Sequence, residues 1–527
     1  MTEEHGAGAP WAAPTRSPWL IAFTVTLATF MEVLDTSIAN VALPHIAGNL
    51  SVGVDESTWV LTSYLVANAI VLPVSGWISA LVGRKRFYIS CVIVFTTSSI
   101  LCGLAPNLKA LIFFRVLQGL GGGGLQPSEQ SILADNFPPE KRGMAFAFYG
   151  FAVVAAPAIG PTLGGWVTDN VSWRWIFYLN VPVGIVSVIL SSALLRDPEY
   201  LVAERERRRR EGWRIDFAGL GLIALGLGAL QVVLDKGERE DWFASHMIVA
   251  LSIVSAVALV LAVVHELTTD ELVVDLSLLG ERNFGAACAL MMLLGVVLLG
   301  STVLLPQLAQ QLLGYTATWA GLALSPGALL IMAMMPVVGF LTTRIDARIL
   351  VLFGLASGAV ALLGLAQFSL DVDFRKLVLA RSAQAIGLAF LFVPINTLSY
   401  AFVPPGKSNA ASGLINLARN IGGSVGISAV TTLLARRAQV HQSYLVAHLT
   451  PFDPEVRPWL LATSRRLHEH APGLRSYRAL YEVLGRQSGM LAYADVFRTL
   501  AACFAVSTVF LLLVKRVKPG AKPAMAH

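Results

Sequence analysis

Two acidic residues in the stretch FMEVLDTSIANVALP, residues 30 to 44, carry the first chemical signal of this sequence. Glu32 and Asp35 are three residues apart, so on a helix they would project about 60° apart from one face, with Glu32 one turn deeper. A charged side chain inside a membrane costs about 2.5 to 3.5 kcal/mol on insertion scales and usually faces a polar cavity. These carboxylates are therefore candidates for handling protons or a substrate, with a purely structural buried ion pair as the alternative.

Arg115 is the cation that these carboxylates would meet. It lies about seven residues, or roughly 10 Å, from the end of its apolar run, and Asp35 lies about eight residues from the end of its own, so the two share a level. A neighbouring arginine favours the ionised form of one carboxylate, while two close carboxylates disfavour joint ionisation. We expect one carboxylate to stay charged and the other to load and release a proton. Glu129 is a further candidate for proton coupling, although it could also reach the membrane interface, and Arg381 and Arg419 are further charges inside apolar runs.

The elements that must position these residues are membrane helices. Of the 527 residues, 55% are hydrophobic and 14% are charged, whereas a soluble domain carries roughly a quarter charged residues. About 20 apolar residues span the hydrocarbon core, and short alternating segments typical of a membrane β-barrel are lacking, so we predict fourteen helical spans. They are expected near residues 18–43, 58–82, 87–105, 108–133, 144–167, 175–195, 215–234, 246–264, 284–306, 319–341, 349–370, 377–403, 410–434 and 496–514.

A repeated pattern predicts two related halves. RVLQGLG at 115–121 and RSAQAIG at 381–387 both read R-x-x-Q-x-x-G, and a parallel repeat about the membrane normal is a known transporter plan with its site between the halves. The expected units are a cytoplasmic tail at 1–17, a six-helix bundle at 18–195, a basic cytoplasmic linker at 196–214, two inserted helices at 215–264, a cytoplasmic linker at 265–283, a second six-helix bundle at 284–514 that includes an external loop at 435–494, and a cytoplasmic tail at 515–527.

The basic residues fall mainly on alternate loops, and by the positive-inside rule this asymmetry places both termini in the cytoplasm. The net charge of +6 is thus topological and does not indicate nucleic-acid binding. The four cysteines all lie in predicted spans and suit packing, so neither a disulfide framework nor a metal site is expected. A nucleophile, base and orienting group cannot be assembled from the sequence, and the phosphate-loop-like stretches lack their strand–helix context. We therefore expect a transporter and not an enzyme.

Several motifs together resemble one family. LDTSIANVALP (34–44), STWVLTSY (57–64), RVLQGLGGG (115–123), PAIGPTLGG (157–165) and WRWIFYLNVPVG (173–184) are similar to those of the fourteen-span drug:proton antiporters of the EmrB/QacA type, within the major facilitator superfamily. The resemblance implies an all-α membrane fold of two pseudo-symmetric six-helix bundles plus two inserted helices. It implies proton coupling by Asp35 and Arg115.

Two further motifs follow from the resemblance. It assigns an antiporter motif to Pro157, Gly160, Pro161, Gly164 and Gly165. The loop after the second span holds the family's Gly76, Gly83, Arg84, Lys85 and Arg86. In that loop Ala80 stands where many members carry an aspartate, which puts in doubt an ion-pair latch between the halves.

The expected function is proton-driven export of amphipathic or aromatic compounds by alternating access, with a dedicated exporter of one metabolite, such as a siderophore, fatty acid or amino acid, as the alternative. The energy source would be the proton gradient, without a cofactor. The resemblance favours a bacterial inner-membrane location and partnership with a periplasmic adaptor and an outer-membrane channel. Candidate residues for the substrate cavity are Asn40, Tyr64, Gln118, Gln126, Gln384, Asn396, Arg381 and Asn416.

Overall fold

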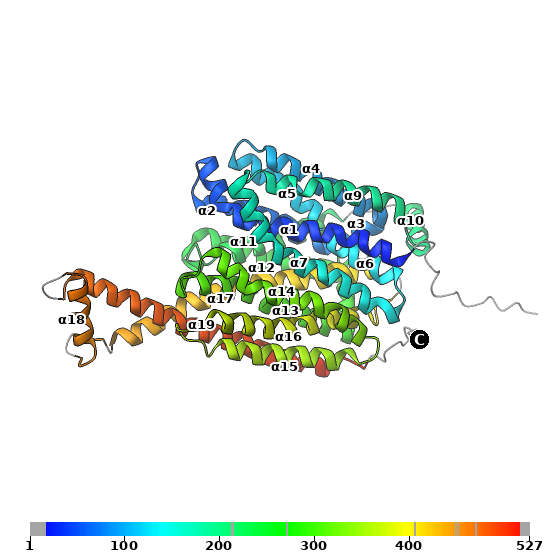
Figure 1. Cartoon of the computed structure of the whole chain (residues 1–527). Coiled ribbons are helices and arrows are strands. Elements are labelled where there is room, and N and C mark those ends of the chain that lie inside the picture. The colour runs from blue at the N-terminus through cyan, green and yellow to red at the C-terminus, as the bar shows by residue number, and fades with distance from the viewer. Residues whose placement is uncertain are drawn as a thin grey trace, which may run out of the picture.

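The computed structural model shows a bundle of long helices that run along a common direction (Figure 1). It describes residues 17–211, 216–269, 272–404, 407–447, 449–450, 453–468 and 472–516, and within these ranges it contains helices and turns but no strand. Two names are used below for the ends of the bundle. The Arg84 end is where α4 begins and where α10 lies, and the Trp59 end is where α3 begins and where α2 and α18 lie.

The first half of the bundle follows the predicted spans with two interruptions, of which the shorter separates α8 from α9 at Leu179. The run expected as a single helix at 108–133 is divided into α5 and α6 at Gly123 and Gly124. A Cβ at Gly123 would lie 2.6 Å from the Asn68 carbonyl oxygen, so this glycine run allows a close approach of two helices that a larger residue would block. The helices of this half are α1 Pro18–Leu50, α2 Val54–Ser57, α3 Trp59–Val82, α4 Arg84–Leu104, α5 Leu108–Gly122, α6 Leu125–Asn136, α7 Pro139–Asn170, α8 Trp175–Tyr178 and α9 Asn180–Leu194.

The segment between the halves contains more helix than expected. The basic linker predicted at 196–214 forms a helix, α10, over much of its length, and the two inserted helices follow it. Asp216 begins the first of them, because its side chain accepts a hydrogen bond from the Gly219 amide at 2.8 Å and so satisfies a free N–H of the first turn. The elements are α10 Glu199–Glu211, α11 Phe217–Lys236, η1 Trp242–Ala244, α12 His246–Thr268 and η2 Leu276–Gly280.

The segment expected outside the membrane at 435–494, as a small and partly helical element, is largely helical. Both flanking helices continue far into this segment, and with α18 they form a projection beyond the Trp59 end of the bundle (Figure 1). Its exposed polar positions lack the uniform apolarity of a membrane span. The elements are α13 Arg282–Gln307, η3 Leu308–Leu312, α14 Ala317–Leu341, α15 Ala347–Leu365, α16 Phe374–Tyr400, α17 Ser408–Ala447, α18 Val456–Arg466 and α19 Leu474–Leu513.

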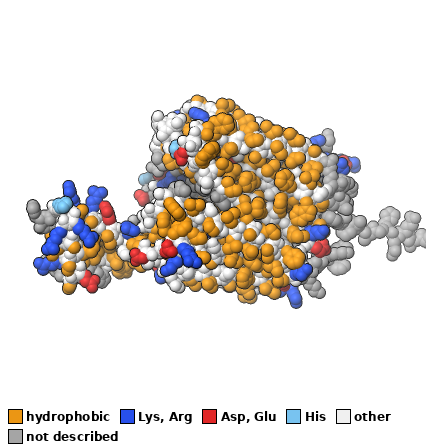
Figure 2. Space-filling view, viewed as in Figure 1, with side chains coloured by type: hydrophobic (Ala, Val, Ile, Leu, Met, Phe, Trp, Pro, Cys, Tyr) orange, Lys and Arg blue, Asp and Glu red, His pale blue; other side chains and the backbone are white. Residues whose placement is uncertain are grey.

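The surface of the bundle confirms that the chain is a multi-pass membrane protein. Apolar side chains cover its flank, while charged groups gather on the projection and at the opposite end (Figure 2). Eleven helices among the described residues are long and apolar enough to cross a membrane, and α7, bent by 40° between Glu140–Pro157 and Thr162–Asn170, would make a twelfth. The helices α5 and α6, which are shorter, and α17, which is more polar, pack in the same bundle, so the count of fourteen spans stays a prediction.

Small residues bring the two halves together near the Arg84 end. A Cβ at Gly76 of α3 would lie 3.0 Å from the backbone of Asn409 and Ala410 in α17. A Cβ at Gly339 of α14 would lie 2.8 Å from the Cβ of Ala147 in α7. Lipid offers no hydrophobic drive for helix association, so such close contacts carry the packing. The first of these contacts holds α3 against α17, and both helices carry residues of the candidate site.

Candidate functional site

A buried ion pair lies at the centre of the first half. Arg115 Nη1 of α5 lies 2.6 Å from Asp35 Oδ2 of α1, and neither side chain is more than 1% exposed. Taking two charges out of water is costly unless further hydrogen bonds satisfy them. The pairing places together the two residues that sequence depth put on one level.

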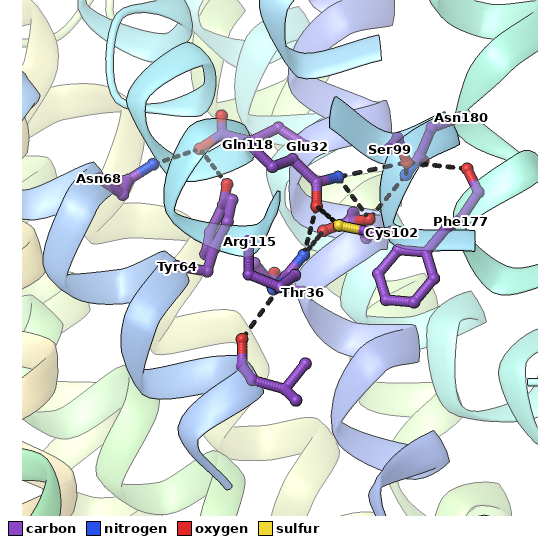
Figure 3. A network of polar contacts seen from close by, with 12 residues as sticks. Glu32, Thr36, Tyr64, Asn68, Ser99, Cys102, Arg115, Gln118, Phe177 and Asn180 are labelled. Carbon is purple, nitrogen blue, oxygen red and sulfur yellow. Dashed lines mark hydrogen bonds and ion pairs between the residues drawn. The ribbon is translucent and has the colours of Figure 1, made fainter. Parts of the chain in front are cut away.

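Gln118 and Asn180, both labelled in Figure 3, complete the hydrogen bonding of Asp35 from within the first half. Its Oδ1 accepts from Gln118 Nε2 at 3.0 Å and from Asn180 Nδ2 at 2.6 Å, and both donors also reach Ser99 Oγ, at 3.3 and 2.9 Å. Arg115 Nη1 donates to Gln118 Oε1 at 2.8 Å. The carboxylate thus receives three donors from α5 and α9, which compensate for its burial.

Glu32 has a different environment, although it lies on the same helix. Its Oε1 accepts from Asn68 Nδ2 at 3.1 Å and from the Tyr64 hydroxyl at 3.4 Å, both in α3. Its Oε2 is buried without a hydrogen-bond partner in the structure. Asn68 Oδ1 in turn accepts from Asn420 Nδ2 of α17 at 3.2 Å. Glu32 is therefore linked to the second half through one residue, Asn68, and two hydrogen bonds, while the hydrogen-bond partners of Asp35 all belong to the first half.

Tyr64 joins the two carboxylate environments. Its ring lies under the Arg115 guanidinium, with 4.3 Å from Cζ to the ring centroid, and its hydroxyl points to Glu32 (Figure 3). Arg115 Nε donates to the carbonyl of Val60 one turn earlier in α3, at 3.0 Å. A displacement of Arg115 would therefore disturb contacts with α3 at two residues, Val60 and Tyr64.

Glu129 does not reach the membrane interface, which corrects one of its two expected placements. It is fully buried in α6, its Oε1 accepts from the Tyr88 hydroxyl at 3.5 Å, and its Oε2 has no partner in the structure. The division of the expected span into α5 and α6 turns this side chain into the bundle. A buried carboxylate with a free oxygen can carry a proton, so Glu129 keeps its place as a candidate for proton coupling.

Two of the cavity candidates belong to the ion-pair network, since Tyr64 and Gln118 are buried within it. Two others bridge the halves. Gln126 Oε1 accepts from the Tyr149 hydroxyl at 3.2 Å and from Arg419 Nη2 of α17. Asn416 Nδ2 donates to Gln130 Oε1 at 2.9 Å.

The remaining cavity candidates lie apart from this network. Arg381 Nη1 donates to Gln384 Oε1 at 2.7 Å within α16. Asn396 Nδ2 donates to the Phe392 carbonyl in the same helix, at 2.8 Å. Asn40 is exposed.

The glycines of the proposed antiporter motif pack α7 against α1 close to the carboxylates. A Cβ at Gly160 would clash with Ser37, and one at Gly164 would lie 2.8 Å from Ile38 Cγ2. Gly165 has open space, and Pro157 is half-buried beside the bend in α7. The side chain of Pro161 lies outside the described residues.

The loop motif after α3 ties the Arg84 end together without an aspartate at position 80. Arg84 Nη1 lies 2.6 Å from Asp135 Oδ2, and Asp135 Oδ1 accepts from Ser408 Oγ of the second half at 3.0 Å. Gly83 has a φ of +99°, a conformation that side chains disfavour. The Lys85 amide donates to Asp197 at 2.7 Å, while Arg86 is exposed. The latch between the halves is thus made by hydrogen bonds.

Sequence reasoning missed the amides and hydroxyls that complete the network. Asn68 is 36 positions from Glu32, to which it donates, and Asn180 is 145 positions from Asp35, to which it donates. Ser99 accepts from the same two amides that donate to Asp35. Only the fold brings these residues together. A signal was available for Asn180, because it is a polar residue within the apolar stretch WRWIFYLNVPVG. A polar side chain in a span is rarely left toward lipid.

Comparison with known proteins gives consistent matches. Residues 25–427 match the family model of the Major Facilitator Superfamily. The multidrug export protein EmrB of Haemophilus influenzae is 42% identical over 436 residues, which cover 82% of this chain and 84% of that protein. EmrB of Escherichia coli is 41% identical over 447 residues, 84% of this chain and 86% of that protein.

Two further matches bear on the substrate and on the fold. The fatty acid resistance protein FarB of Neisseria gonorrhoeae is 39% identical over 433 residues, 82% of this chain and 84% of that protein. The solved structure of the proton:xylose symporter XylE aligns with a TM-score of 0.61 at 13% identity, over 95% of this chain and 97% of that one. At that identity the likeness concerns the fold alone.

Proposed function

The chain belongs to the Major Facilitator Superfamily, as its motifs predicted, and we propose that it is a proton-driven exporter of amphipathic or aromatic compounds. The observation that carries this proposal is the buried Asp35–Arg115 pair beside a second buried carboxylate, Glu32, which has a free oxygen. The names of the EmrB relatives add support for multidrug export. The chain is proposed to act as a transporter and not as an enzyme.

The chemistry divides between the two carboxylates. Asp35 accepts hydrogen bonds from Arg115 and from two amide donors, so in this proposal it becomes available to a proton only when the network loosens. Glu32 receives weaker hydrogen bonds and lies next to Asn68, which contacts the second half. A proton on Glu32 can therefore respond to movement between the halves. One proton that moves down 100 mV releases about 2.3 kcal/mol, which can drive uphill export.

The orientation and setting are part of the proposal. The Arg84 end, with its cluster of basic residues, faces the cytoplasm by the positive-inside rule, so the projection at the Trp59 end faces outward. The proton gradient of the bacterial inner membrane supplies the energy without a cofactor. A periplasmic adaptor with an outer-membrane channel would continue the export route. The support for this partner is the resemblance of the first-span and fifth-span motifs to the EmrB-like branch.

The proposal is tested in inverted membrane vesicles that carry an imposed proton gradient. Ethidium serves as a lipophilic cation, and its uptake and the accompanying proton release are measured for the wild type, Asp35→Asn and Glu32→Gln. We expect Asp35→Asn to abolish coupled exchange and Glu32→Gln to lower it at least ten-fold. Asp371→Asn, a change at an exposed site between α15 and α16, is the matched control. Undiminished exchange in both membrane variants would disprove the assignment.

A second candidate function is export of one carboxylate-bearing metabolite, such as a fatty acid. Arg381 and Arg419 are inside the bundle and make no ion pair among the described residues, and each has a buried nitrogen without a partner. They could pair with an anionic headgroup, and the relative FarB is named for fatty acid resistance. Competition between ethidium and a fluorescent fatty acid distinguishes the two. Transport of the acid alone, lost in Arg419→Gln, would favour the second function.

A further inference from the structure

The inserted helix α11 contacts both halves of the bundle. A Cβ at Gly228 would lie 3.3 Å from Ile70 Cδ1 of α3, in the first half. Gln231 Oε1 accepts from Ser424 Oγ of α17, in the second half, at 3.0 Å, and Gln231 is buried. A helix that only filled space at the lipid-facing rim would not place a buried amide against α17. The Gln231 contact therefore indicates that α11 links the two halves.

At its Trp59 end α11 is fixed to the first turns of α3. The Lys236 side chain is buried, its Nζ donates to Thr58 Oγ1, and it lies 4.8 Å from the centroid of the Trp59 ring. The neighbouring Asp235 accepts from Thr62 Oγ1. A buried ammonium group must keep its acceptors, so these contacts fix α11 to residues 58–62 of α3.

The chain just beyond α11 is fixed to α17. Glu238 Oε2 accepts from Thr432 Oγ1 at 2.5 Å and from Trp242 Nε1 at 2.9 Å. Trp242 Nε1 also reaches Thr432 Oγ1, at 3.0 Å. Asp241 and Trp242 have φ values of 54° and 52°, which non-glycine residues adopt only where surrounding contacts hold them. The turn after α11 is thus built to present an indole and a carboxylate to one threonine of the second half.

The same short stretch of α3 also holds the ion pair. The Val60 carbonyl, between Thr58 and Thr62, accepts from Arg115 Nε at 3.0 Å. Residues 58–62 therefore contact Arg115 on one side and Lys236 on the other. Through Glu238 this connection continues to Thr432 of α17.

We propose that Lys236 and Glu238 are positioning residues of the transport cycle, which couple the Arg115-bound turn of α3 to α17 of the opposite half. The inference rests on the proposed function for its role in transport, but its structural content does not. These contacts stabilise the arrangement of halves seen in this structure. Release of Arg115 from Asp35 would shift the α3 turn and weaken the connection, which would let the halves rearrange. The two inserted helices thereby take part in the cycle.

The test measures the arrangement of the halves directly, without any substrate. Spin labels are placed at the Trp59 end by Val171→Cys in the first half and Asp371→Cys in the second, in the full chain lacking its native cysteines and held in lipid nanodiscs. The measured quantity is the ratio of molecules at the label separation of the present structure to molecules at other separations. We expect Lys236→Met and Thr432→Val each to reduce this ratio roughly five-fold, which is the effect of one hydrogen bond of ordinary strength.

Matched variants separate positioning from a general loss of packing. Thr431→Val is the control, because among the described residues the Thr431 hydroxyl bonds only to carbonyls of its own helix, at 2.9 and 3.0 Å. It should leave the distances unchanged. Lys236→Arg and Thr432→Ser should restore the wild-type distribution. Wild-type distances in both Lys236→Met and Thr432→Val would overturn the inference. Failure of ethidium exchange in the wild type would instead refute the proposed function and leave this measurement standing.

Discussion

Arg115 and Arg381 occupy matching positions in the two halves, and their immediate surroundings are nearly the same. Each donates from Nη1 to the glutamine three residues later, at 2.8 Å for Gln118 and 2.7 Å for Gln384. Gly121, the last residue of the first motif, would place a Cβ 2.7 Å from the Phe95 amide of α4. The matching Gly387 would place one 2.7 Å from the Gly358 amide of α15.

The two arginines differ in whether a carboxylate faces the guanidinium. Arg115 has Asp35, together with Tyr64 beneath its guanidinium, whereas Arg381 makes no ion pair among the described residues and leaves its Nε without a partner. The repeated motif therefore encodes helix packing and a polar pair in both halves. The carboxylate that makes the pair responsive to a proton was placed in α1 alone. Proton coupling is thus expected to belong to the first half, and the second half offers a free cation.

The largest difference between the two halves should come from removal of each arginine in turn. Arg115→Met strands a buried carboxylate, which costs about 3 to 5 kcal/mol of stability, and should abolish exchange. Arg381→Met removes a buried charge and leaves no carboxylate behind, so its stability should change little. Thermal unfolding in detergent measures the stability of both variants, and vesicle exchange measures their transport. Equal losses of stability and transport in the two variants would contradict the difference between the halves.

The glycines should behave alike, which tests the shared part of the comparison. Gly121→Ala and Gly387→Ala both press a methyl group into a neighbouring backbone, and each should destabilise by about 1 to 3 kcal/mol. Gly364→Ala in α15 serves as the control, because a Cβ there meets nothing within 4 Å. Apparent melting temperatures measure the effect. Tolerance of alanine at one site only would mean that the halves are packed differently.

An added carboxylate should lower the stability when it is placed in the first half and hold or raise it when it is placed in the second. Gln118→Glu places a second acid beside Asp35, whose Oδ1 lies 3.0 Å from Gln118 Nε2, so it should destabilise by about 1 to 2 kcal/mol, and less at low pH, where one acid is protonated. Gln384→Glu gives Arg381 the counter-ion that it lacks and should hold or raise the melting temperature. Melting curves at pH 5 and pH 8 make the comparison. A loss of stability in Gln384→Glu would contradict it.

The smallest effect is expected from an ion pair outside the membrane. Lys407 Nζ lies 2.6 Å from Asp275 Oδ2, with the lysine side chain 45% exposed. Burial alone would raise the pKa of Asp275, but hydrogen bonds from Lys407 and Ser277 outweigh it and lower that pKa below its ordinary value.

The stability that this pair contributes is present above the ordinary aspartate pKa and is lost as the pH falls through the lowered one. Asp275→Asn should therefore cost less than about 1 kcal/mol at pH 7, and the cost should vanish once the pH falls below the lowered pKa of Asp275. Unfolding followed across this pH range measures it. A cost that persists in acid would assign Asp275 a role other than its charge.

The site could be predicted in part because membrane depth is a one-dimensional quantity. Counting residues from the ends of two apolar runs placed Asp35 level with Arg115, and the structure joins them. The same count left two placements open for Glu129, and the structure buries its side chain. The extent of helix in the projection beyond the Trp59 end could not be read from the sequence, because exposed helices with mixed faces resemble loops in an apolar chain.

The sequence by itself determined that the chain crosses a membrane many times, that its halves are related and that charges are buried in the first half, because apolar length, motif spacing and the cost of a buried charge are local properties. Only the tertiary structure decided that Asp35 is saturated by Gln118 and Asn180 while Glu32 faces the second half through Asn68. It also decided that α11 joins α3 to α17. These are contacts between distant segments, and they depend on the rotation of each helix about its own axis, which apolar periodicity leaves open where a helix is apolar on every side.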